Sequence, residues 1–368
     1  MYKVLHILSG ADGGGISNVV LNYYKNLDRE KIQFDIAFLV NSEGYIADEF
    51  QKMGSEIFVL PLKSKSVKAY KQELEKILRR KQYDAIHIHE NETSFVGLSV
   101  AKKMGIKQRI AHSHTSAPYV SLYGDIKRRI GCFLNYYFSS CVMACGVLAG
   151  DRIFGKRNMR KKKSIVLPNA IDLEKFKFNQ EIRDVYRNEL QITDKYVIGM
   201  VGRLAPEKNF LFGLKIVKKV HEKLPNAVFL IVGEGTEREE IETFIKINKM
   251  EEYVKLLGLR EDVANLYQCF DVLIMPSIHE GFPLVAVEGI ATGLYVLLSS
   301  KITSELECYT SVKYCSLDNL EDWVSEVIKN SCNTERENKG KELIKTNLNI
   351  KNATEELERI YLTGIIKK

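Results

Sequence analysis

The sequence predicts an α/β protein built from two doubly wound domains. Short apolar segments alternate with amphipathic segments along the whole chain, which favours parallel sheets with helices on both faces. The chain has 368 residues, more than one hydrophobic core usually supports, and hydrophobic residues make up 45% of it, enough to fill two cores.

The expected strands fall into two sets. In the first half they lie at roughly 2–8, 33–40, 56–60, 84–89, 107–113, 140–145 and 164–167. In the second half they lie at roughly 195–202, 227–232, 253–257, 271–275 and 294–299. We therefore expect an N-terminal domain over 1–172 and a C-terminal domain over 173–351. Ligands of such sheets bind beyond the carboxyl ends of the strands, so two domains facing across a cleft are expected to bind one there.

The apolar strand 271–275 leads into a loop and a helix that together carry two carboxylates. Glu280 is expected in the loop, Pro283 at the first helical position and Glu288 about two turns into a helix that ends near Gly293. Backbone N–H groups at such a helix start can bind a phosphate. Taken alone, Glu280 is also typical of a solvated loop and Glu288 of a paired, half-buried acid.

The segment 197–209 is expected to be a buried strand that ends in a loop bearing two cations, Arg203 and Lys208. An Arg fork and a Lys point charge above the strand ends can bind a diphosphate and neutralise the charge that builds as it leaves. Surface loops also carry Arg and Lys, so either residue alone would indicate little.

Together, the two motifs resemble the donor-binding half of the retaining glycosyltransferases of family 4. That pattern is a Gly-Arg-Leu-(three residues)-Lys loop, then Glu-Gly-Phe-Pro, then a second Glu separated from the first by seven residues. The resemblance extends to 13–15, 168–172 and 232–235, and it is greatest to the branch that builds capsular and other surface polysaccharides. One departure is Ile16-Ser17-Asn18, where the family often has a Glu, which leaves the role of those side chains open.

The resemblance implies the GT-B fold, in which two Rossmann-like domains face each other and a C-terminal helix, here 352–368, packs back onto the first. It implies that Arg203 and Lys208, with amides at the helix start, stabilise the departing diphosphate. Glu280 would bind sugar hydroxyls and Glu288 the ribose hydroxyls. The other residues expected at the donor are Gly14, Gly15, Gly202, Gly233, Leu259, Arg260, Gly281, Phe282, Pro283 and Leu284, of which Leu259 and Arg260 would lie at the base.

The turn Gly233-Glu234-Gly235 follows an expected strand and partly matches a dinucleotide-binding fingerprint. The third glycine of that fingerprint is absent because Arg238 occupies its place, so the match is weak evidence for NAD. In the family this turn approaches the nucleotide, whereas a tight strand-to-helix turn explains it equally well.

Four histidines lie on two expected strands of the first domain: His87, His89, His112 and His114. Such a group can bind a metal, but a metal site usually includes carboxylates or thiolates at fixed spacing, so hydrogen-bonded histidines at strand ends are the expected explanation. The resemblance implies that a histidine here touches the donor sugar. That residue is expected to be His114, with His112 as the other possibility.

Charge is divided unevenly along the chain. Residues 1–180 hold 29 Lys and Arg against 17 Asp and Glu, a net of +12, and the remainder has 25 against 30, a net of −5. A basic half indicates an anionic partner: a membrane surface, a phosphorylated lipid acceptor or nucleic acid, the last being disfavoured because no nucleic-acid motif accompanies the charge. The basic, aromatic segment 119–138 and the basic run 155–163 are typical of a membrane interface, or of a sheet-covering helix and a solvated loop.

Several features bear on location and cofactors. No segment is long and apolar enough to span a bilayer, the opening residues are too short for a signal peptide, and the seven cysteines are scattered, so a cytoplasmic protein with reduced thiols is expected. The sequence contains no Asp-x-Asp motif, so we expect no metal and no cofactor, the nucleotide sugar being a substrate.

These features favour a metal-independent, retaining hexosyl- or N-acetylhexosaminyltransferase. It would move a sugar from a nucleotide diphosphate donor, UDP by resemblance, to a glycan or lipid-linked acceptor in surface polysaccharide synthesis, at the inner face of the plasma membrane. Two alternatives remain open: a nucleotide-sugar epimerase of the same architecture, and a non-catalytic nucleotide-sugar-binding subunit of a polysaccharide assembly complex. A nicotinamide dehydrogenase is disfavoured by the incomplete fingerprint.

Overall fold

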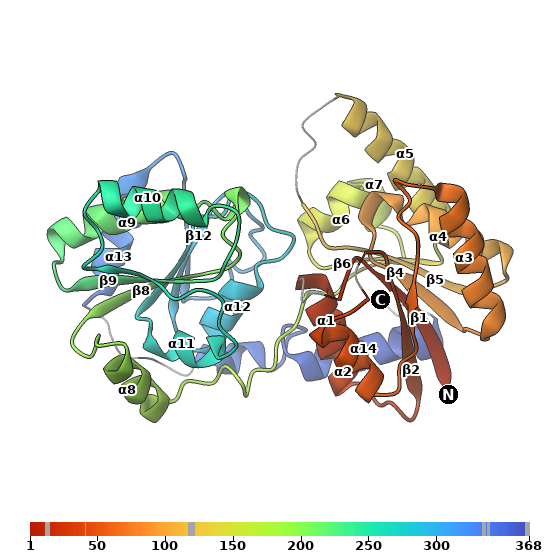
Figure 1. Cartoon of the computed structure of the whole chain (residues 1–368), viewed down its shortest axis with the longest axis horizontal. Coiled ribbons are helices and arrows are strands. Elements are labelled where there is room, and N and C mark those ends of the chain that lie inside the picture. Colours follow the sequence, from red (N-terminus) through yellow and green to blue (C-terminus); the bar gives the residue numbers. More distant parts are fainter. Residues whose placement is uncertain (12–14, 41, 117–121, 333–335, 337–338, 365–368) are drawn as a thin grey trace. The chain divides into compact units, whose positions relative to one another are not determined.

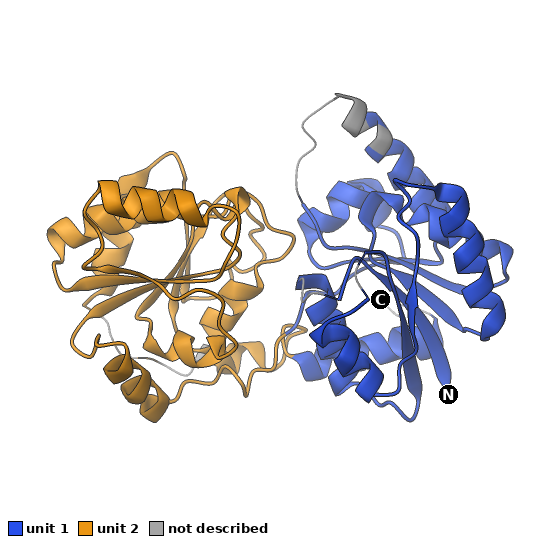
Figure 2. Cartoon of the chain, in the orientation of Figure 1, with its two compact units in different colours: residues 1–170, 350–368 blue, residues 171–349 orange. Residues whose placement is uncertain are grey.

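The computed structural model describes residues 1–11, 15–40, 42–116, 122–332, 336 and 339–364. It divides into two compact units (Figures 1 and 2). Unit 1 comprises 1–170 and 350–368, and unit 2 comprises 171–349. The chain therefore leaves unit 1 once and returns to it with its last helix.

Unit 1 contains a seven-stranded parallel sheet with the strand order β3-β2-β1-β4-β5-β6-β7. The order reverses direction between β1 and β4, which pair in register with His6 opposite His87. The strands are β1 Tyr2–Leu8, β2 Ile32–Phe38, β3 Ile57–Val59, β4 Ala85–Ile88, β5 Gln108–Ser113, β6 Cys141–Ala144 and β7 Ser164–Val166.

Helices cover both faces of this sheet (Figure 1). One face carries α1, α2 and α14, and α1 packs against α14; the other carries the series α3 to α6. The helices are α1 Gly15–Asn26, α2 Tyr45–Lys52, α3 Val67–Arg80, the 3-10 turn η1 Asn91–Thr93, α4 Phe95–Lys103, α5 Leu122–Phe138, α6 Val147–Phe154, α7 Lys156–Met159 and α14 Ile350–Thr363.

Unit 2 contains a six-stranded parallel sheet with the order β10-β9-β8-β11-β12-β13, which reverses between β8 and β11. The strands are β8 Tyr196–Val201, β9 Ala227–Val232, β10 Val254–Leu256, β11 Val272–Met275, β12 Tyr295–Ser299 and β13 Val312–Cys315. The edge strand β13 is absent from the sequence prediction. Only one of its four residues is buried, so its apolar pattern is too short to stand out.

Two helical layers enclose the second sheet (Figure 1). Helices α9, α10 and α13 cover one face, where Trp323 is fully buried, and α11 and α12 cover the other. The helical elements are α8 Gln180–Glu189, the 3-10 turn η2 Pro206–Lys208, α9 Phe210–Lys223, α10 Arg238–Ile247, α11 Val263–Cys269, α12 Leu284–Ala291, α13 Leu320–Asn330 and the 3-10 turn η3 Lys339–Leu343.

One sequence prediction about α12 is wrong. Pro283 is the N-cap, with φ −82° and ψ 76°, rather than the first helical residue, so the helix begins at Leu284. Glu288 consequently lies about one turn into the helix instead of two. Gly293, with φ 79°, follows the C-cap Thr292, in agreement with the expected end of the helix.

No helix in the described part of the chain combines the length and the apolar character needed to span a bilayer.

Candidate active site

Two loops of unit 2 emerge beyond the carboxyl ends of β8 and β11, where the strand order reverses. The first runs through η2 to Asn209 and the second from Pro276 to Pro283. The Ile278 N–H donates to the Glu207 carbonyl at 2.8 Å, and the Asn209 side-chain amide donates to the Pro276 carbonyl at 3.2 Å. Because backbone and side chain both tie the loops together, they form one surface at the point where such sheets bind ligands.

Lys208 and Glu280, one from each loop, form an ion pair with 2.6 Å between Nζ and Oε1. Their side chains are only 18% and 12% exposed, so water screens the pair less than a surface salt bridge. Glu280 is therefore not the solvated loop residue that its sequence context alone suggests. The structure brings these two expected site residues into direct contact.

Arg203, expected beside Lys208, is 71% exposed and pairs with Glu207 at 2.5 Å. An exposed ion pair of this kind is weak, so the guanidinium is available to exchange Glu207 for a more strongly charged partner. A diphosphate is such a partner, since its oxygens accept two parallel hydrogen bonds from one guanidinium.

Two glycines bring the ends of β8 and β9 unusually close. A Cβ on Gly233 would lie 1.9 Å from the Gly202 carbonyl oxygen, and the two glycines have φ of 140° and 150°. Both conformations strain any residue with a side chain. Glycine is required here by packing, which gives the tight-turn explanation of Gly233 a direct physical cause.

Glu288 accepts a hydrogen bond from the Tyr267 hydroxyl at 2.7 Å. Burial raises the pKa of this carboxyl to about 7, while the Tyr267 hydrogen bond and the charges of Lys175 and Lys208 oppose the rise. Lys208 thus acts electrostatically on Glu288 as well as on Glu280. Tyr267 went unnoticed in the sequence because a buried tyrosine on α11 has no distinguishing pattern.

Leu259 and Arg260, expected near the base, follow Gly258 on the loop after β10. The Leu259 side chain is 80% exposed, and Arg260 forms two hydrogen bonds of 2.7 and 2.6 Å with Asp262. The exposed Leu259 is open to a planar ligand, whereas the Arg260 guanidinium already has a partner.

The start of α12 has fewer free backbone N–H groups for a phosphate than the sequence predicts. The N–H of Leu284 donates to the Phe282 carbonyl at 3.0 Å, and those of Ala286 and Val287 donate to the Pro283 carbonyl. Phe282 and Pro283 themselves are buried, beside Gly281. Two polar atoms of the preceding loop are buried without a hydrogen-bond partner, the Ser277 hydroxyl and His279 Nδ1. Such atoms suit a polar ligand.

In unit 1 the glycine loop lies only partly within the described residues. Gly14 is outside them, while Gly15 is the first residue of α1. A Cβ on Gly15 would meet nothing within 4 Å, so packing does not require glycine there. The absence of a side chain leaves the backbone accessible at the start of α1.

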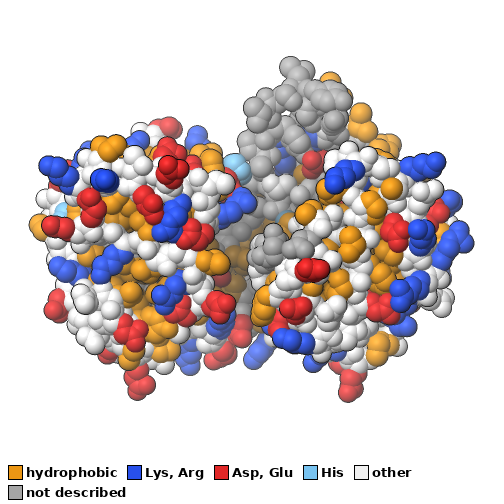
Figure 3. Space-filling view, viewed as in Figure 1, with side chains coloured by type: hydrophobic (Ala, Val, Ile, Leu, Met, Phe, Trp, Pro, Cys, Tyr) orange, Lys and Arg blue, Asp and Glu red, His pale blue; other side chains and the backbone are white. Residues whose placement is uncertain are grey.

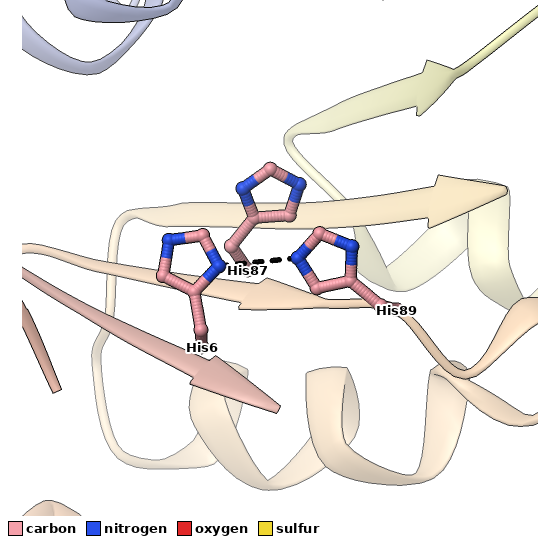
Figure 4. Close-up of side chains that lie close together, drawn as sticks. All are labelled: His6, His87 and His89. Carbon is pink, nitrogen blue, oxygen red and sulfur yellow. Dashed lines mark hydrogen bonds between the residues drawn. The ribbon is translucent and has the colours of Figure 1, made fainter. Parts of the chain in front are cut away.

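Five histidines of unit 1 lie together on, or directly after, β1, β4 and β5 where the first sheet reverses. They are His6, His87, His89, His112 and His114. Figure 4 shows the first three, with His6 Nδ1 3.1 Å from His89 Nε2. His6, on the neighbouring strand β1, was not among the four histidines expected from the sequence, because it is a single polar residue within the apolar run 4–8.

The histidines form two groups whose ligand atoms lie within 4.8 Å, His6 with His87 and His89, and His89 with His112 and His114. Burial lowers the pKa of His6 and His114 to about 3 and those of the other three well below the usual range, so all five are neutral near pH 7. Neither group contains a carboxylate or thiolate to offset the charge of a metal ion. The expectation that every histidine is satisfied is wrong at two buried atoms, His112 Nε2 and His114 Nδ1, which lack a partner.

Two doubly wound parallel sheets, the second with a Lys–Glu pair and a half-buried Glu beyond its strand ends, define a glycosyltransferase of the GT-B class. Residues 182–317 match the family of glycosyl transferases group 1, and residues 13–175 match glycosyltransferase family 4. A Bacillus subtilis (strain 168) protein named "Putative glycosyltransferase EpsF" is 30% identical over 311 residues, covering 83% of this chain and 81% of EpsF. The chain therefore belongs to the family 4 glycosyltransferases.

Other relatives span most of the chain. The UDP-Gal:alpha-D-GlcNAc-diphosphoundecaprenol alpha-1,3-galactosyltransferase of Escherichia coli is 27% identical, covering 81% of this chain and 79% of that enzyme. The capsular polysaccharide biosynthesis glycosyltransferase CapH of Staphylococcus aureus is 22% identical, covering 89% and 90%. The structure of Anabaena Alr3699/HepE in complex with UDP superposes with a TM-score of 0.83 at 16% identity, covering 99% of this chain and all of that one, which confirms the fold.

Proposed function

We propose that this protein is a retaining glycosyltransferase that moves a hexosyl or N-acetylhexosaminyl group from a UDP-sugar to a glycan or lipid-linked acceptor in the synthesis of a surface polysaccharide. The observation that supports this most is the Lys208–Glu280 pair at the reversal point of the second sheet, with Glu288 within its electrostatic reach. A cation for the leaving group and two carboxylates for hydroxyls are what this transfer needs.

In the proposed reaction the bond from the anomeric carbon to the diphosphate breaks and its electrons pass to the diphosphate. Lys208 and Arg203 stabilise the negative charge on the diphosphate. This stabilisation is largest in the transition state. The acceptor hydroxyl attacks from the same face, so the anomeric configuration is retained, and its proton passes to the departing phosphate oxygen. No metal ion takes part.

The remaining side chains position the donor. Glu280 accepts hydrogen bonds from sugar hydroxyls and Glu288 from the ribose, while Leu259 lies against the base. His114 contacts the sugar close to the reacting carbon. Neutral His114, its pKa lowered by burial, suits a hydrogen-bonding role better than a charged one.

The choice of UDP and of a polysaccharide product is supported by the similar proteins. The Escherichia coli relative is named for UDP-Gal and a diphosphoundecaprenol acceptor, HepE was solved with UDP, and CapH is named for capsular polysaccharide. Diphosphoundecaprenol is a lipid-linked acceptor, so the name of the Escherichia coli relative supports the proposed place of action, the inner face of the plasma membrane.

Calorimetric titration with UDP, GDP, ADP and NAD tests the donor site without an acceptor. Of these four ligands, we expect only UDP to bind tightly. UDP-sugars are then screened with lipid-linked glycans, and we expect the NMR signal of the anomeric proton in the product to show that the configuration is retained. Conversion of the donor with no acceptor present would instead identify the epimerase. Binding without any turnover would favour the non-catalytic subunit.

A membrane contact is supported by α5. Its surface carries an apolar stripe at helical spacing, in which every side chain is at least 53% exposed: Ile126, Ile130, Phe133 and Tyr137. In Figure 3 hydrophobic side chains emerge beside the grey residues where this helix lies. The helix therefore does more than cover the sheet, because Cys132 and Asn135 point inward while the stripe faces solvent. A basic run on α7 and the residues after it is also exposed.

Vesicle sedimentation tests this contact. We expect the protein to bind vesicles containing phosphatidylglycerol more than neutral phosphatidylcholine vesicles, and Phe133→Glu to abolish the difference. Ile247→Glu is a matched control, since Ile247 is 73% exposed on α10 of unit 2. Equal binding of wild type and Phe133→Glu would remove α5 from the membrane contact.

A further inference from the structure

The buried histidines of unit 1 are joined end to end by a tyrosine of the last helix. His112 Nδ1 lies 3.1 Å from His87 Nε2, and His87 Nδ1 lies 2.7 Å from the Tyr361 hydroxyl. The hydroxyl lies 3.2 Å from His6 Nε2. All three distances suit hydrogen bonds.

The series continues on the other side of Tyr361. His6 Nδ1 lies 3.1 Å from His89 Nε2, and His89 Nδ1 lies 2.8 Å from His114 Nε2. Six side chains are thus linked in a single sequence, which we name the histidine ladder: His112, His87, Tyr361, His6, His89 and His114. Its terminal atoms, His112 Nε2 and His114 Nδ1, are the two ring nitrogens of the ladder that find no hydrogen-bond partner among the described residues.

Proton counting restricts this ladder to two arrangements. Each neutral imidazole has one N–H and one lone pair, and the phenol has one O–H, so six protons serve five links. If the ladder donates toward His114, every histidine is protonated on Nδ1. If it donates toward His112, every histidine is protonated on Nε2. Any mixture leaves at least one link with two protons or with none, or leaves the Tyr361 O–H without an acceptor.

Burial makes a faulty link costly, because a buried donor or acceptor without its partner loses the hydration it would have in water. The same burial keeps the histidines neutral, and it raises the pKa of the Tyr361 phenol well above its usual range. An extra proton would remove a lone pair that a neighbour needs on every imidazole except the terminal one whose lone pair lies at the end of the ladder. The direction of hydrogen-bond donation along the ladder therefore reverses at all five links together or at none of them.

We propose that the histidine ladder is one cooperative hydrogen-bonded unit in which Tyr361, on the C-terminal helix, fixes the tautomer and ring orientation of His114. Tyr361 is then a positioning residue for His114, acting through His6 and His89. The structural part of this inference needs no donor. Only its kinetic consequence rests on the proposed function, in which His114 touches the sugar.

The near-parallel orientation of the histidine rings argues against a shared metal ion as the reason for this arrangement. The rings of His6 and His89 are 17° apart in orientation, and those of His87 and His89 are 21° apart. Ligand lone pairs lie in the ring planes, so near-parallel rings do not direct them to one point. The nitrogens of the ladder instead approach each other in pairs at hydrogen-bond distance.

Long-range proton–nitrogen NMR of protein labelled at the histidine ring nitrogens tests the proposal, because it distinguishes the two tautomers and the imidazolium. We expect all five ladder histidines to share one tautomer at pH 7, with no imidazolium. His221 is an internal reference for the Nδ1–H form, since its Nδ1 lies 3.0 Å from the Ala227 carbonyl. A mixture of tautomers within the ladder overturns the proposal, as does about one equivalent of tightly bound metal.

Tyr361→Phe divides the ladder into two shorter pieces. We expect the ring signals of His114 to move or broaden although Tyr361 is two histidines away, and unchanged His114 signals would contradict the proposal. Tyr23→Phe is the matched control, because Tyr23 is also buried in unit 1 but donates to the Pro168 carbonyl at 3.1 Å. If Tyr361→Phe does not fold, the wild-type tautomers alone decide.

Kinetics provide a second readout that separates this inference from the proposed function. For Tyr361→Phe we expect kcat for sugar transfer to fall about three- to tenfold, as for one net hydrogen bond, with UDP affinity unchanged. A wild-type protein that binds no UDP would count against the proposed function and leave the tautomer result standing. Unchanged kcat together with altered His114 signals would confine the ladder to a structural role and overturn its positioning role.

Discussion

The two sheets of this protein reverse direction in the same way, yet the side chains at the two reversal points differ in charge. Unit 1 places neutral imidazoles and a phenol there, whereas unit 2 places the Lys208–Glu280 ion pair and the exposed Arg203. The histidines lie on or directly after strands and are buried, while the charged residues lie on loops beyond the strand ends. The same topology thus supports a neutral network or a charged site, according to how far past the strand the side chains lie.

In the proposed reaction, this difference places the charge chemistry in unit 2. Lys208→Ala is expected to lower turnover about 10²- to 10³-fold, because it removes a cation that acts on charge developing in the transition state. Initial rates at saturating donor measure this. Lys215→Ala, an exposed lysine on α9, is the control and should keep wild-type rates. Near-normal turnover of Lys208→Ala would remove this lysine from the mechanism.

Glu288→Gln is expected to weaken UDP binding about ten- to a hundredfold, the usual value of a hydrogen bond to a charged group. Calorimetry measures it. Glu326→Gln is a close control, since Glu326 also accepts a hydrogen bond from a tyrosine hydroxyl in unit 2, that of Tyr295 at 2.9 Å. Equal losses in both variants would indicate a general effect on unit 2 rather than a ribose contact.

The comparison also predicts which unit responds to pH. The pKa of Glu288 is about 7, and the ionised carboxylate is the form that accepts ribose hydroxyls, so UDP affinity should rise about tenfold from pH 6 to pH 8. Glu288→Gln should lose this pH dependence. Its loss would distinguish titration of Glu288 from titration of the nucleotide, which the variant leaves unchanged. The free energy of unfolding should show the opposite trend, falling between pH 4.5 and 7, because the folded state holds this proton longer than the unfolded chain. A rise of affinity retained in Glu288→Gln would contradict this assignment.

A smaller effect is expected at Arg203. Its present ion pair with Glu207 is exposed, so Arg203→Ala should change the free energy of unfolding by less than about 1 kcal/mol. Turnover should fall about threefold to tenfold, less than for Lys208→Ala, because water screens an exposed guanidinium. A loss equal to that of Lys208→Ala would mean that Arg203 becomes buried when the donor binds.

The smallest expected effect is that of chelation. In the proposed reaction Lys208 and Arg203 supply the positive charge, so turnover should be unchanged in EDTA. Activity that disappears with EDTA and returns with Mg²⁺ or Mn²⁺ would contradict the metal-independent mechanism. The difference in side-chain charge between the two units would then matter less for the reaction.

Local patterns in the sequence predicted much of this molecule. Apolar runs located twelve of the thirteen strands of the described chain to within about two residues. Motif spacing placed Lys208 and Glu280 at one site, because neighbouring strands end at the same edge of a sheet. The missed edge strand β13 is half-exposed, and the N-cap conformation of Pro283 depends on φ and ψ that spacing does not encode.

Contacts between distant segments were harder to predict. His6 and Tyr361 are 355 positions apart, yet they meet through a hydrogen bond in unit 1. Neither residue has a sequence signature, and their contact depends on strand order and on where the last helix packs. Tyr267 beside Glu288 is a similar case, since a tyrosine on an apolar helix gives no sign of which acid it reaches.

The last helix also has a consequence for synthesis on the ribosome. Unit 2 is one continuous stretch, 171–349, whereas unit 1 needs α14, whose Leu357, Ile360 and Tyr361 are buried in it. A nascent chain can therefore complete the second unit while the first still lacks part of its core. The unit whose translation begins first is thus completed second, and its apolar surface for α14 stays open until α14 has been translated.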